Sequence, residues 1–245
     1  MAMARCMGIP MVEGPTADAA LYRLMAWLSP SYPVGAFSHS SGLEWANEAG
    51  WVVDRPGLIA WIEDALAHGA GWNDAVLFVH AHRAAAFGDD DWLAEVADLA
   101  AALATSRERQ VETLAQGTAF LTISRAAWPV PGLERLAARV GETVAYPVAV
   151  AACAAGHGIA LTPSLTAFLH AVAANLVSAA QRLVPLGQTD GQRAIAALMP
   201  AVAEIAARAA ALPDGDPFSQ CGGLAVAADI ASMQHETQYT RLFRT

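Results

Sequence analysis

Lysine is absent from all 245 residues of this chain, and every basic side chain is an arginine. A Walker-type phosphate loop needs a lysine to reach the nucleotide phosphates, and an enzymatic Schiff base needs a lysine amine. The sequence therefore excludes a P-loop nucleoside triphosphatase and a lysine-based covalent catalyst. Charged residues make up only 15% of the chain, against 55% hydrophobic residues. With this balance we expect a compact fold that also buries apolar surface against a partner.

The chain has few cysteines, and its acidic residues outnumber its basic ones. Cys6, Cys153 and Cys221 are odd in number and lack Cys-x-x-Cys spacing, which indicates reduced thiols rather than a disulfide framework. No secretory signal is evident near the N-terminus, so we expect a cytoplasmic location. The 14 basic and 23 acidic residues give a net charge of -9, which repels nucleic acid and anionic lipid. We expect no nucleic acid and no membrane among the partners.

No segment alternates apolar and polar residues long enough to predict a sheet, and no internal repeat is evident. Alanine, the best helix former, supplies much of the hydrophobic content. The sequence predicts an all-α fold, a single-domain helical bundle of about ten helices. We expect a disordered N-terminal segment at residues 1–17, an all-helical domain at 18–235 and a C-terminal tail at 236–245 that binds a partner.

Capping signals predict where most helices begin. We expect a loop at Leu212–Gly223 and a last helix at Leu224–His235. The other expected helix starts are Asp18, Ser41 with Glu44 three residues on, Asp54, Asp74, Asp89, Ser106, a short helix at Leu133, Thr162 before Pro163, and Thr189 with Gln192 three residues on.

Residues 143–181 contain no charged side chain, a length that would suffice for a membrane span. Pro147, Gly156 and the pair Thr162-Pro163 interrupt this stretch. We interpret it as two core helices that meet near Gly156, and a peripheral membrane protein stays an alternative.

Two groups of residues are candidates for chemistry. Ser38 lies beside His39, but the segment lacks the Gly-x-Ser-x-Gly turn of a hydrolase, and helix capping is the simpler interpretation. A helical hydrolase that uses Ser38 and His39 stays the alternative. Cys153 and His157 share a helix face, yet a closed metal site needs about four ligands. We expect core residues here and no tight metal site.

The stretch R-L-V-P-L-G-Q-T-D-G-Q-R at residues 182–193 is a candidate docking surface. Pro185 and Gly187 account for a helix end and a turn. They do not account for Arg182, Gln188 and Arg193. Because Thr189 and Gln192 can cap the next helix, we expect the charges of Asp190 and Arg193 to be spare for a partner, and the predicted partner-binding residues here are Gln188, Asp190 and Arg193. A polar, arginine-bearing turn on a chain of low charge predicts a partner-binding patch.

The tail H-E-T-Q-Y-T-R-L-F-R-T, residues 235–245, is the second candidate. It combines arginine, tyrosine and large apolar residues, and a chain end has little core of its own to pack into. We expect Leu242 and Phe243 to be exposed at this chain end unless a partner covers them, so a protein without residues 239–245 should fold and lose its partner. The predicted partner-binding residues of the tail are His235, Glu236, Tyr239, Arg241, Leu242, Phe243 and Arg244.

Four separated motifs occur in order along the chain. They are L-S-P-S-Y-P-V-G-A-F-S-H-S-S-G-L-E at 28–44, S-R-E at 106–108 with Gly117, Y-P-V-A at 146–149, and N-L-V-S-A-A-Q-R-L-V-P-L-G-Q-T-D-G-Q-R at 175–193. Together they resemble the motifs of one known family, that of the urease accessory protein UreF, and the resemblance runs from Leu21 to the end. At Arg109 the sequence departs from the family, with R-E-R-Q at residues 107–110 where R-E-T-R is common.

This resemblance implies an all-helical, non-catalytic adaptor that dimerises. It implies that the adaptor binds UreD, also called UreH, and recruits the GTPase UreG to apo-urease for nickel insertion. The missing lysine agrees, since this chain cannot supply the phosphate loop of that GTPase. We expect no cofactor in the chain itself, with nickel handled by the complex.

Overall fold

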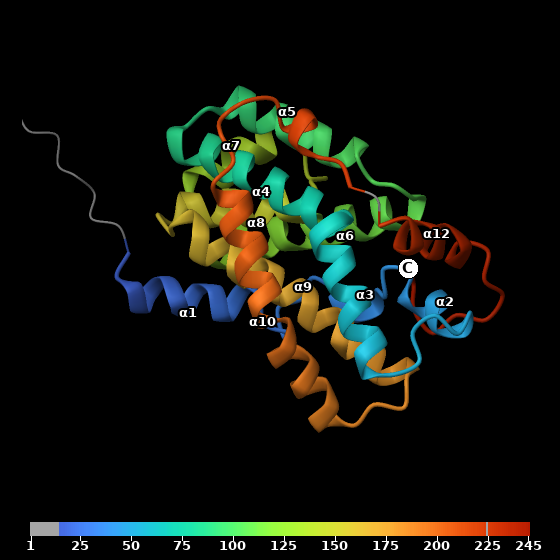
Figure 1. Cartoon of the computed structure of the whole chain (residues 1–245). Coiled ribbons are helices and arrows are strands. Elements are labelled where there is room, and N and C mark those ends of the chain that lie inside the picture. The colour runs from blue at the N-terminus through green and yellow to red at the C-terminus, as the bar shows by residue number, and fades with distance from the viewer. Residues whose placement is uncertain (1–14, 224) are drawn as a thin grey trace, which may run out of the picture.

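The computed structural model describes residues 15–223 and 225–245, and every regular element among them is a helix (Figure 1). The predicted all-α fold is confirmed, with twelve α-helices and one 3-10 helix in this part of the chain. In order they are α1 (Ala17–Trp27), η1 (Ala36–Ser38), α2 (Leu43–Glu48), α3 (Arg55–His68), α4 (Ala70–Phe87), α5 (Asp90–Ala102), α6 (Arg107–Ala127), α7 (Pro131–Val140), α8 (Tyr146–Gly156), α9 (Leu161–Leu183), α10 (Gln188–Ala210), α11 (Pro217–Gln220) and α12 (Val226–His235).

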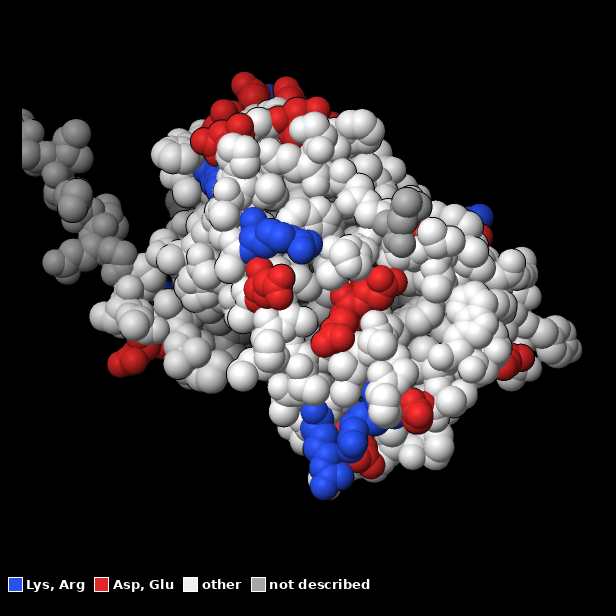
Figure 2. All heavy atoms as spheres, viewed as in Figure 1, with Lys and Arg blue, Asp and Glu red and all other residues white. Residues whose placement is uncertain are grey.

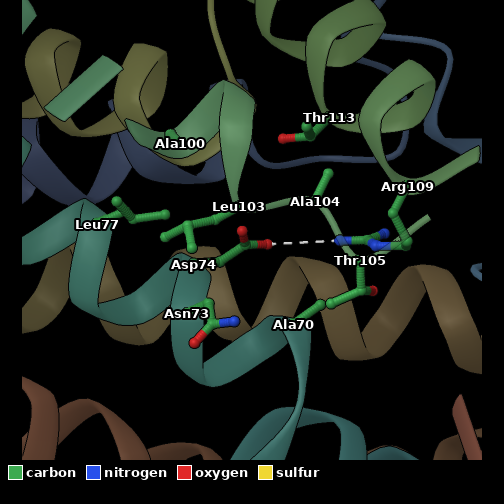
Figure 3. A pocket seen from close by; sticks show the side chains of 10 residues that line it. All are labelled: Ala70, Asn73, Asp74, Leu77, Ala100, Leu103, Ala104, Thr105, Arg109 and Thr113. Carbon is green, nitrogen blue, oxygen red and sulfur yellow. Dashed lines mark ion pairs between the residues drawn. The ribbon is translucent and has the colours of Figure 1, made fainter. Parts of the chain in front are cut away.

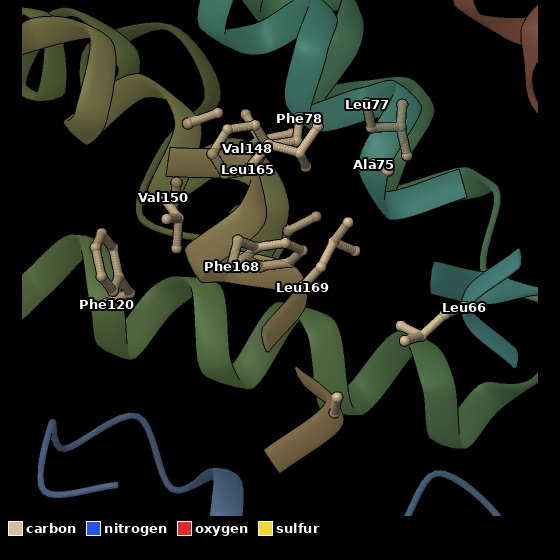
Figure 4. Packing of buried hydrophobic residues seen from close by; sticks show 14 of the residues in the cluster. Leu66, Ala75, Leu77, Phe78, Phe120, Val148, Val150, Leu165, Phe168 and Leu169 are labelled. Carbon is tan, nitrogen blue, oxygen red and sulfur yellow. The ribbon is translucent and has the colours of Figure 1, made fainter. Parts of the chain in front are cut away.

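Helix α8 lies at the centre of the core, packed against α4 on one side and α6 on the other. All of its residues from Pro147 to Ala154 are buried. The rings of Phe78, Phe120 and Phe168 are fully buried around it (Figure 4). Each such ring contributes roughly 1.5–3 kcal/mol of hydrophobic stabilisation, so this cluster is a main source of the stability of the fold.

The uncharged stretch forms α8 and α9, as predicted. Helix α9 packs against α10, α3, α4 and α8. By length and composition alone it is the one helix in the described part of the chain that could cross a membrane, and half of its apolar window is buried inside the fold. A core helix has this degree of burial.

Gly117 sets how closely α6 and α8 approach. A Cβ atom at this position would lie 2.0 Å from the Val144 carbonyl oxygen, which is far inside van der Waals contact. Thr113, one turn earlier, accepts a hydrogen bond from the first amide of α8, at Tyr146. The glycine and the Tyr-Pro-Val-Ala motif therefore belong to one helix crossing.

The capping box predicted at Ser41 and Glu44 is wrong. Helix α2 begins at Leu43, and its N-cap is Gly42 with a φ of 82°. A Cβ atom on Gly42 would lie 2.6 Å from the Ser232 amide nitrogen, so the approach of α12 requires glycine there. The side chains of Ser41 and Glu44 instead bond residues that are distant in the sequence, Glu112 and Phe243 respectively.

Two other predicted N-caps are displaced. Helix α9 begins with Ala160 as its N-cap, so Thr162 lies inside the first turn, where Pro163 is still tolerated. Helix α10 begins with Gly187 as its N-cap rather than Thr189. Asp190 consequently occupies the first helical turn, where its charge favours the positive end of the helix dipole.

Three further boundaries differ from the predictions. Helix α4 begins at Ala70, four residues before Asp74, because Gly69 ends α3 and directly precedes the new helix. The expected loop after Leu212 contains the short helix α11. The expected start of the last helix at Leu224, and most of the N-terminal segment with Cys6, lie outside the described residues.

Candidate functional site

The C-terminal tail packs onto the body of the protein. Phe243 and Thr245 are each only 3% exposed, so the expectation of an exposed Phe243 is wrong. The guanidinium of Arg182 lies 4.1 Å from the centre of the Phe243 ring. The Arg244 amide donates to the Ser38 carbonyl at 2.8 Å. The buried side chains that hold the tail are here called the tail seat; they are His39, Glu44, Glu108, Glu112 and His235.

Glu44 holds the tail by its backbone. Its carboxylate accepts hydrogen bonds from the amides of Leu242 at 2.6 Å and Phe243 at 2.8 Å. The same carboxylate lies 3.1 Å from Nε2 of His235. Because both oxygens are used and the side chain is 7% exposed, this carboxylate is matched to the tail rather than to solvent.

His235 bridges two acidic side chains. Its Nδ1 lies 2.7 Å from Glu108, and its other ring nitrogen contacts Glu44. Arg241 donates to the second oxygen of Glu108 at 3.0 Å. Burial raises the pKa of Glu108, and the contacts with His235 and Arg241 oppose that rise. Each ring nitrogen of His235 therefore faces one carboxylate, so the ring joins Glu44 of α2 to Glu108 of α6, and the exposed Arg241 covers Glu108 from the solvent side.

Glu112 connects the end of the tail to a second polar group. It lies 3.4 Å from the Thr245 hydroxyl, accepts from the Ser41 hydroxyl at 3.0 Å and pairs with Arg109 at 2.8 Å. The Thr245 hydroxyl also lies 2.6 Å from Nδ1 of His39. Burial lowers the pKa of His39, and the nearby charge of Glu112 opposes this.

Arg109 is the centre of this second group, although it departs from the family pattern. It reaches Asp74 on α4 at 3.7 Å (Figure 3). Burial raises the pKa of Asp74 to about 6, while the charge of Arg109 opposes the rise. Sequence reasoning missed Asp74 and Glu112 as site residues. The available signal was an acidic side chain on the apolar face of a helix, which needs a partner when buried.

The turn between α9 and α10 carries a separate cluster of charged side chains on a mostly uncharged surface (Figure 2). Asp190 pairs with Arg55 of α3 at 2.5 Å and with Arg193 at 3.3 Å. Its charge is therefore not free, contrary to the expectation that it is spare for a partner. Gln181 donates to Gln188 at 3.3 Å, which fastens the turn to α9.

The structure connects the two candidate surfaces through α9. Arg182, near its end, donates to the Phe37 carbonyl at 2.7 Å while it covers Phe243. His235 is fully buried and cannot contact a partner in this conformation. For the other predicted residues, partner binding stays a prediction. Asp190 is partly exposed. The exposed ones are Gln188, Arg193, Glu236, Tyr239, Arg241, Leu242 and Arg244.

The two alternative chemical sites do not come together. The Ser38 hydroxyl donates to the Gly35 carbonyl, whereas His39 bonds Thr245, so serine and histidine serve different contacts. Cys153 is fully buried, and burial raises the pKa of its thiol to about 12. His157 bonds the Trp128 carbonyl oxygen at 3.1 Å. Among residues 15–223 and 225–245, no group of three or more His, Cys, Asp and Glu side chains could hold a metal ion.

A cavity of about 220 Å³ adjoins the tail seat. It lies between the segment that follows α1, helix α6 and helix α9, and both Ser41 and Glu112 face it. Smaller cavities of about 30 and 40 Å³ flank Arg109 and Asp74. The buried charges therefore sit beside incompletely filled space.

Comparison with known proteins gives one consistent result. Residues 52–199 match the model of the UreF family. The chain is 58% identical to the urease accessory protein UreF of Rhodopseudomonas palustris strain BisB18. The aligned 229 residues cover 93% of this chain and 92% of that protein. It is 54% identical over 226 residues to UreF of Bradyrhizobium sp. strain BTAi1, with 92% of each chain covered. UreF of Bradyrhizobium diazoefficiens is 52% identical over 227 residues, 93% of this chain and 92% of that protein.

Proposed function

The chain belongs to the UreF family of urease accessory proteins, and we propose that it acts as an adaptor that, with UreD (UreH), recruits the GTPase UreG to apo-urease for nickel insertion. It is an accessory protein and not an enzyme. The observation that carries the proposal is the similarity over nearly the whole chain to proteins named urease accessory protein UreF. In this scheme the adaptor contributes surfaces, and nucleotide hydrolysis comes from a partner.

Two surfaces support an adaptor role. The exposed tail side chains Tyr239 and Leu242 stand on a segment that buried carboxylates hold in place. Pre-ordering of this kind lowers the entropic cost of binding. The turn with Gln188 and Arg193 is likewise anchored by internal contacts. We propose that both surfaces contact members of the maturation complex.

The remaining parts of the proposal concern location, assembly and metal. The protein works in the cytoplasm as a homodimer, and nickel passes through the complex rather than residing in this chain as a cofactor. The buried, protonated thiol of Cys153 supports the last point, because a metal binds the thiolate.

Co-purification tests the proposal. A tagged chain is co-expressed with UreD, UreG and apo-urease, and the retained partners are quantified. We expect Tyr239→Ala with Leu242→Ser to weaken capture, because both side chains are exposed on the tail. Phe87→Ala is the matched control, since Phe87 is 86% exposed and lies at the end of α4. If the wild-type chain retains none of the three partners, the proposed function is wrong.

A further inference from the structure

Arg109 is shared between two carboxylates that belong to different helices. Its Nη1 atom lies 2.8 Å from Oε2 of Glu112 on α6, and its Nη2 atom lies 3.7 Å from Oδ2 of Asp74 on α4. Within residues 15–223 and 225–245, Arg109 is the only ion-pair partner of Asp74. The side chains of Arg109 and Asp74 are 16% and 18% exposed. Because an ionised carboxylate with so little exposure needs a close partner, Asp74 and Glu112 compete for one guanidinium.

The end of the tail depends on the same Glu112 oxygen. The Thr245 hydroxyl donates to Oε2 of Glu112 at 3.4 Å, which is long for a hydrogen bond between two oxygens. Arg109 occupies that oxygen at 2.8 Å. A carboxylate oxygen that a guanidinium already neutralises is a weaker acceptor for a hydroxyl. The position of Arg109 therefore sets how tightly Glu112 binds Thr245.

The surroundings of Arg109 leave room for it to move. Two cavities, of about 30 and 40 Å³, are both lined by Asp74 and Arg109, and each is large enough for a water molecule. Ser41, which accepts a hydrogen bond from Nη1 of Arg109 at 3.0 Å, has a φ of 53°. It is the only residue other than glycine with a positive φ in the described part of the chain. Strained backbone of this kind is typical of switch regions.

The charge of Asp74 changes in the physiological pH range. Burial raises the pKa of this carboxyl to about 6, while the charge of Arg109 opposes the rise and that of Glu112 adds to it. Asp229 of α12 lines the larger of the two cavities, and the charge of Asp74 contributes to the raised pKa of the Cys221 thiol. Helices α3, α5 and α9 contribute only uncharged side chains to these cavities.

We propose that Asp74 is a proton-sensitive switch for the end of the tail: ionised Asp74 draws Arg109 away from Glu112, and the Oε2 atom that Arg109 leaves then binds the Thr245 hydroxyl more tightly. Protonated Asp74 returns Arg109 to Glu112 and weakens the contact with Thr245. The switch lies inside this chain and goes beyond the proposed function. It makes the last residues of the tail more firmly held at pH 7 than at pH 5.

Amide hydrogen exchange of the whole chain at pH 5 and pH 7 tests the proposal. The Arg244 amide donates to the Ser38 carbonyl at 2.8 Å, so its exchange reports detachment of the last residues. We expect its protection factor, corrected for the intrinsic pH dependence of exchange, to be about tenfold higher at pH 7, as for one strengthened hydrogen bond to a carboxylate. Asp74→Asn cannot ionise and should abolish the difference. Asp64→Asn, which removes an exposed carboxylate of α3, is the matched control and should keep it.

Thr245→Val gives an independent test, because coupling between two sites is reciprocal. Loss of the hydroxyl makes ionisation of Asp74 less favourable, so the pKa of Asp74 should rise above its wild-type value in a carboxyl NMR titration. This result decides the question even if Asp74→Asn does not fold. An unchanged pKa would overturn the proposal, and so would a fall, which would mean that Thr245 acts by excluding water.

A difference in Arg244 protection that persists in Asp74→Asn would assign the pH dependence to His39 or His235 and would also overturn the proposal. Equal protection of the wild type at the two pH values would do the same. Both tests use the chain without its partners, so their failure leaves the proposed function standing.

Discussion

Replacing Glu44 with glutamine should release the C-terminal tail while the helices stay folded. One carboxylate oxygen accepts the Leu242 amide and the other accepts the Phe243 amide. Glutamine keeps one acceptor and presents an NH2 group in place of the other, so a donor would face a donor. It also removes one of the two charges that flank His235.

The size of the effect follows from these contacts. A hydrogen bond to a charged group contributes about 1.5–3 kcal/mol, and glutamine loses the charge from both amide contacts and reverses one of them. We expect the tail to be held about 3 kcal/mol more weakly, which raises the fraction of detached tail about a hundredfold. The cost falls on the tail because the helical core around Phe78, Phe120 and Phe168 does not contain Glu44.

Amide hydrogen exchange measures this directly. In the Glu44→Gln variant, protection at Leu242 and Phe243 should fall about a hundredfold, while protection in α8 stays unchanged. Glu48→Gln is the matched control on the same helix, because Glu48 is exposed and accepts only the side chain of Gln238. Unchanged protection of the two tail amides would refute the role given to Glu44.

Three further outcomes are expected. Deletion of Tyr239–Thr245 should abolish partner capture, as predicted from the sequence, and should also lower the melting temperature, because Phe243 leaves a buried site. Asp190→Ala should lower the free energy of unfolding by only about 0.5–1 kcal/mol, since its pair with Arg55 is one-third exposed, and should weaken complex assembly more than that in a pull-down. The pKa of Asp74 is raised to about 6, so the folded chain binds this proton more tightly than the unfolded chain. The stabilisation that protonation of Asp74 provides is therefore complete below about pH 4 and lost as the pH rises through 6, on the order of 3 kcal/mol. Asp74→Asn should flatten this dependence in urea unfolding.

Local signals predicted much of the fold. Asp54, Asp89 and Ser106 each accept a hydrogen bond from the third amide of the helix that follows, as their positions indicated. Such caps depend on neighbours within a few residues, which a sequence displays directly. The family motifs between Leu28 and Arg193 similarly identified the family before the fold was known.

The tail seat could not be predicted in the same way. Ser41 and Glu44 have the spacing of a capping box, but their partners are Glu112, 71 residues away, and Phe243, 199 residues away. Contacts across that separation depend on how the helices pack, and the approach of α12 to Gly42 excludes the local alternative. The burial of Phe243 was missed for the same reason, since a chain end has no local signal for the site that receives it.

The nickel content of urease tests the central claim most directly. Urease is purified from cells that carry the urease gene cluster with and without this chain, and its bound nickel and activity are measured. We predict that urease made without this chain contains little nickel and little activity, and that the wild-type chain restores both. Fully nickel-loaded, active urease in the absence of this chain would contradict the account.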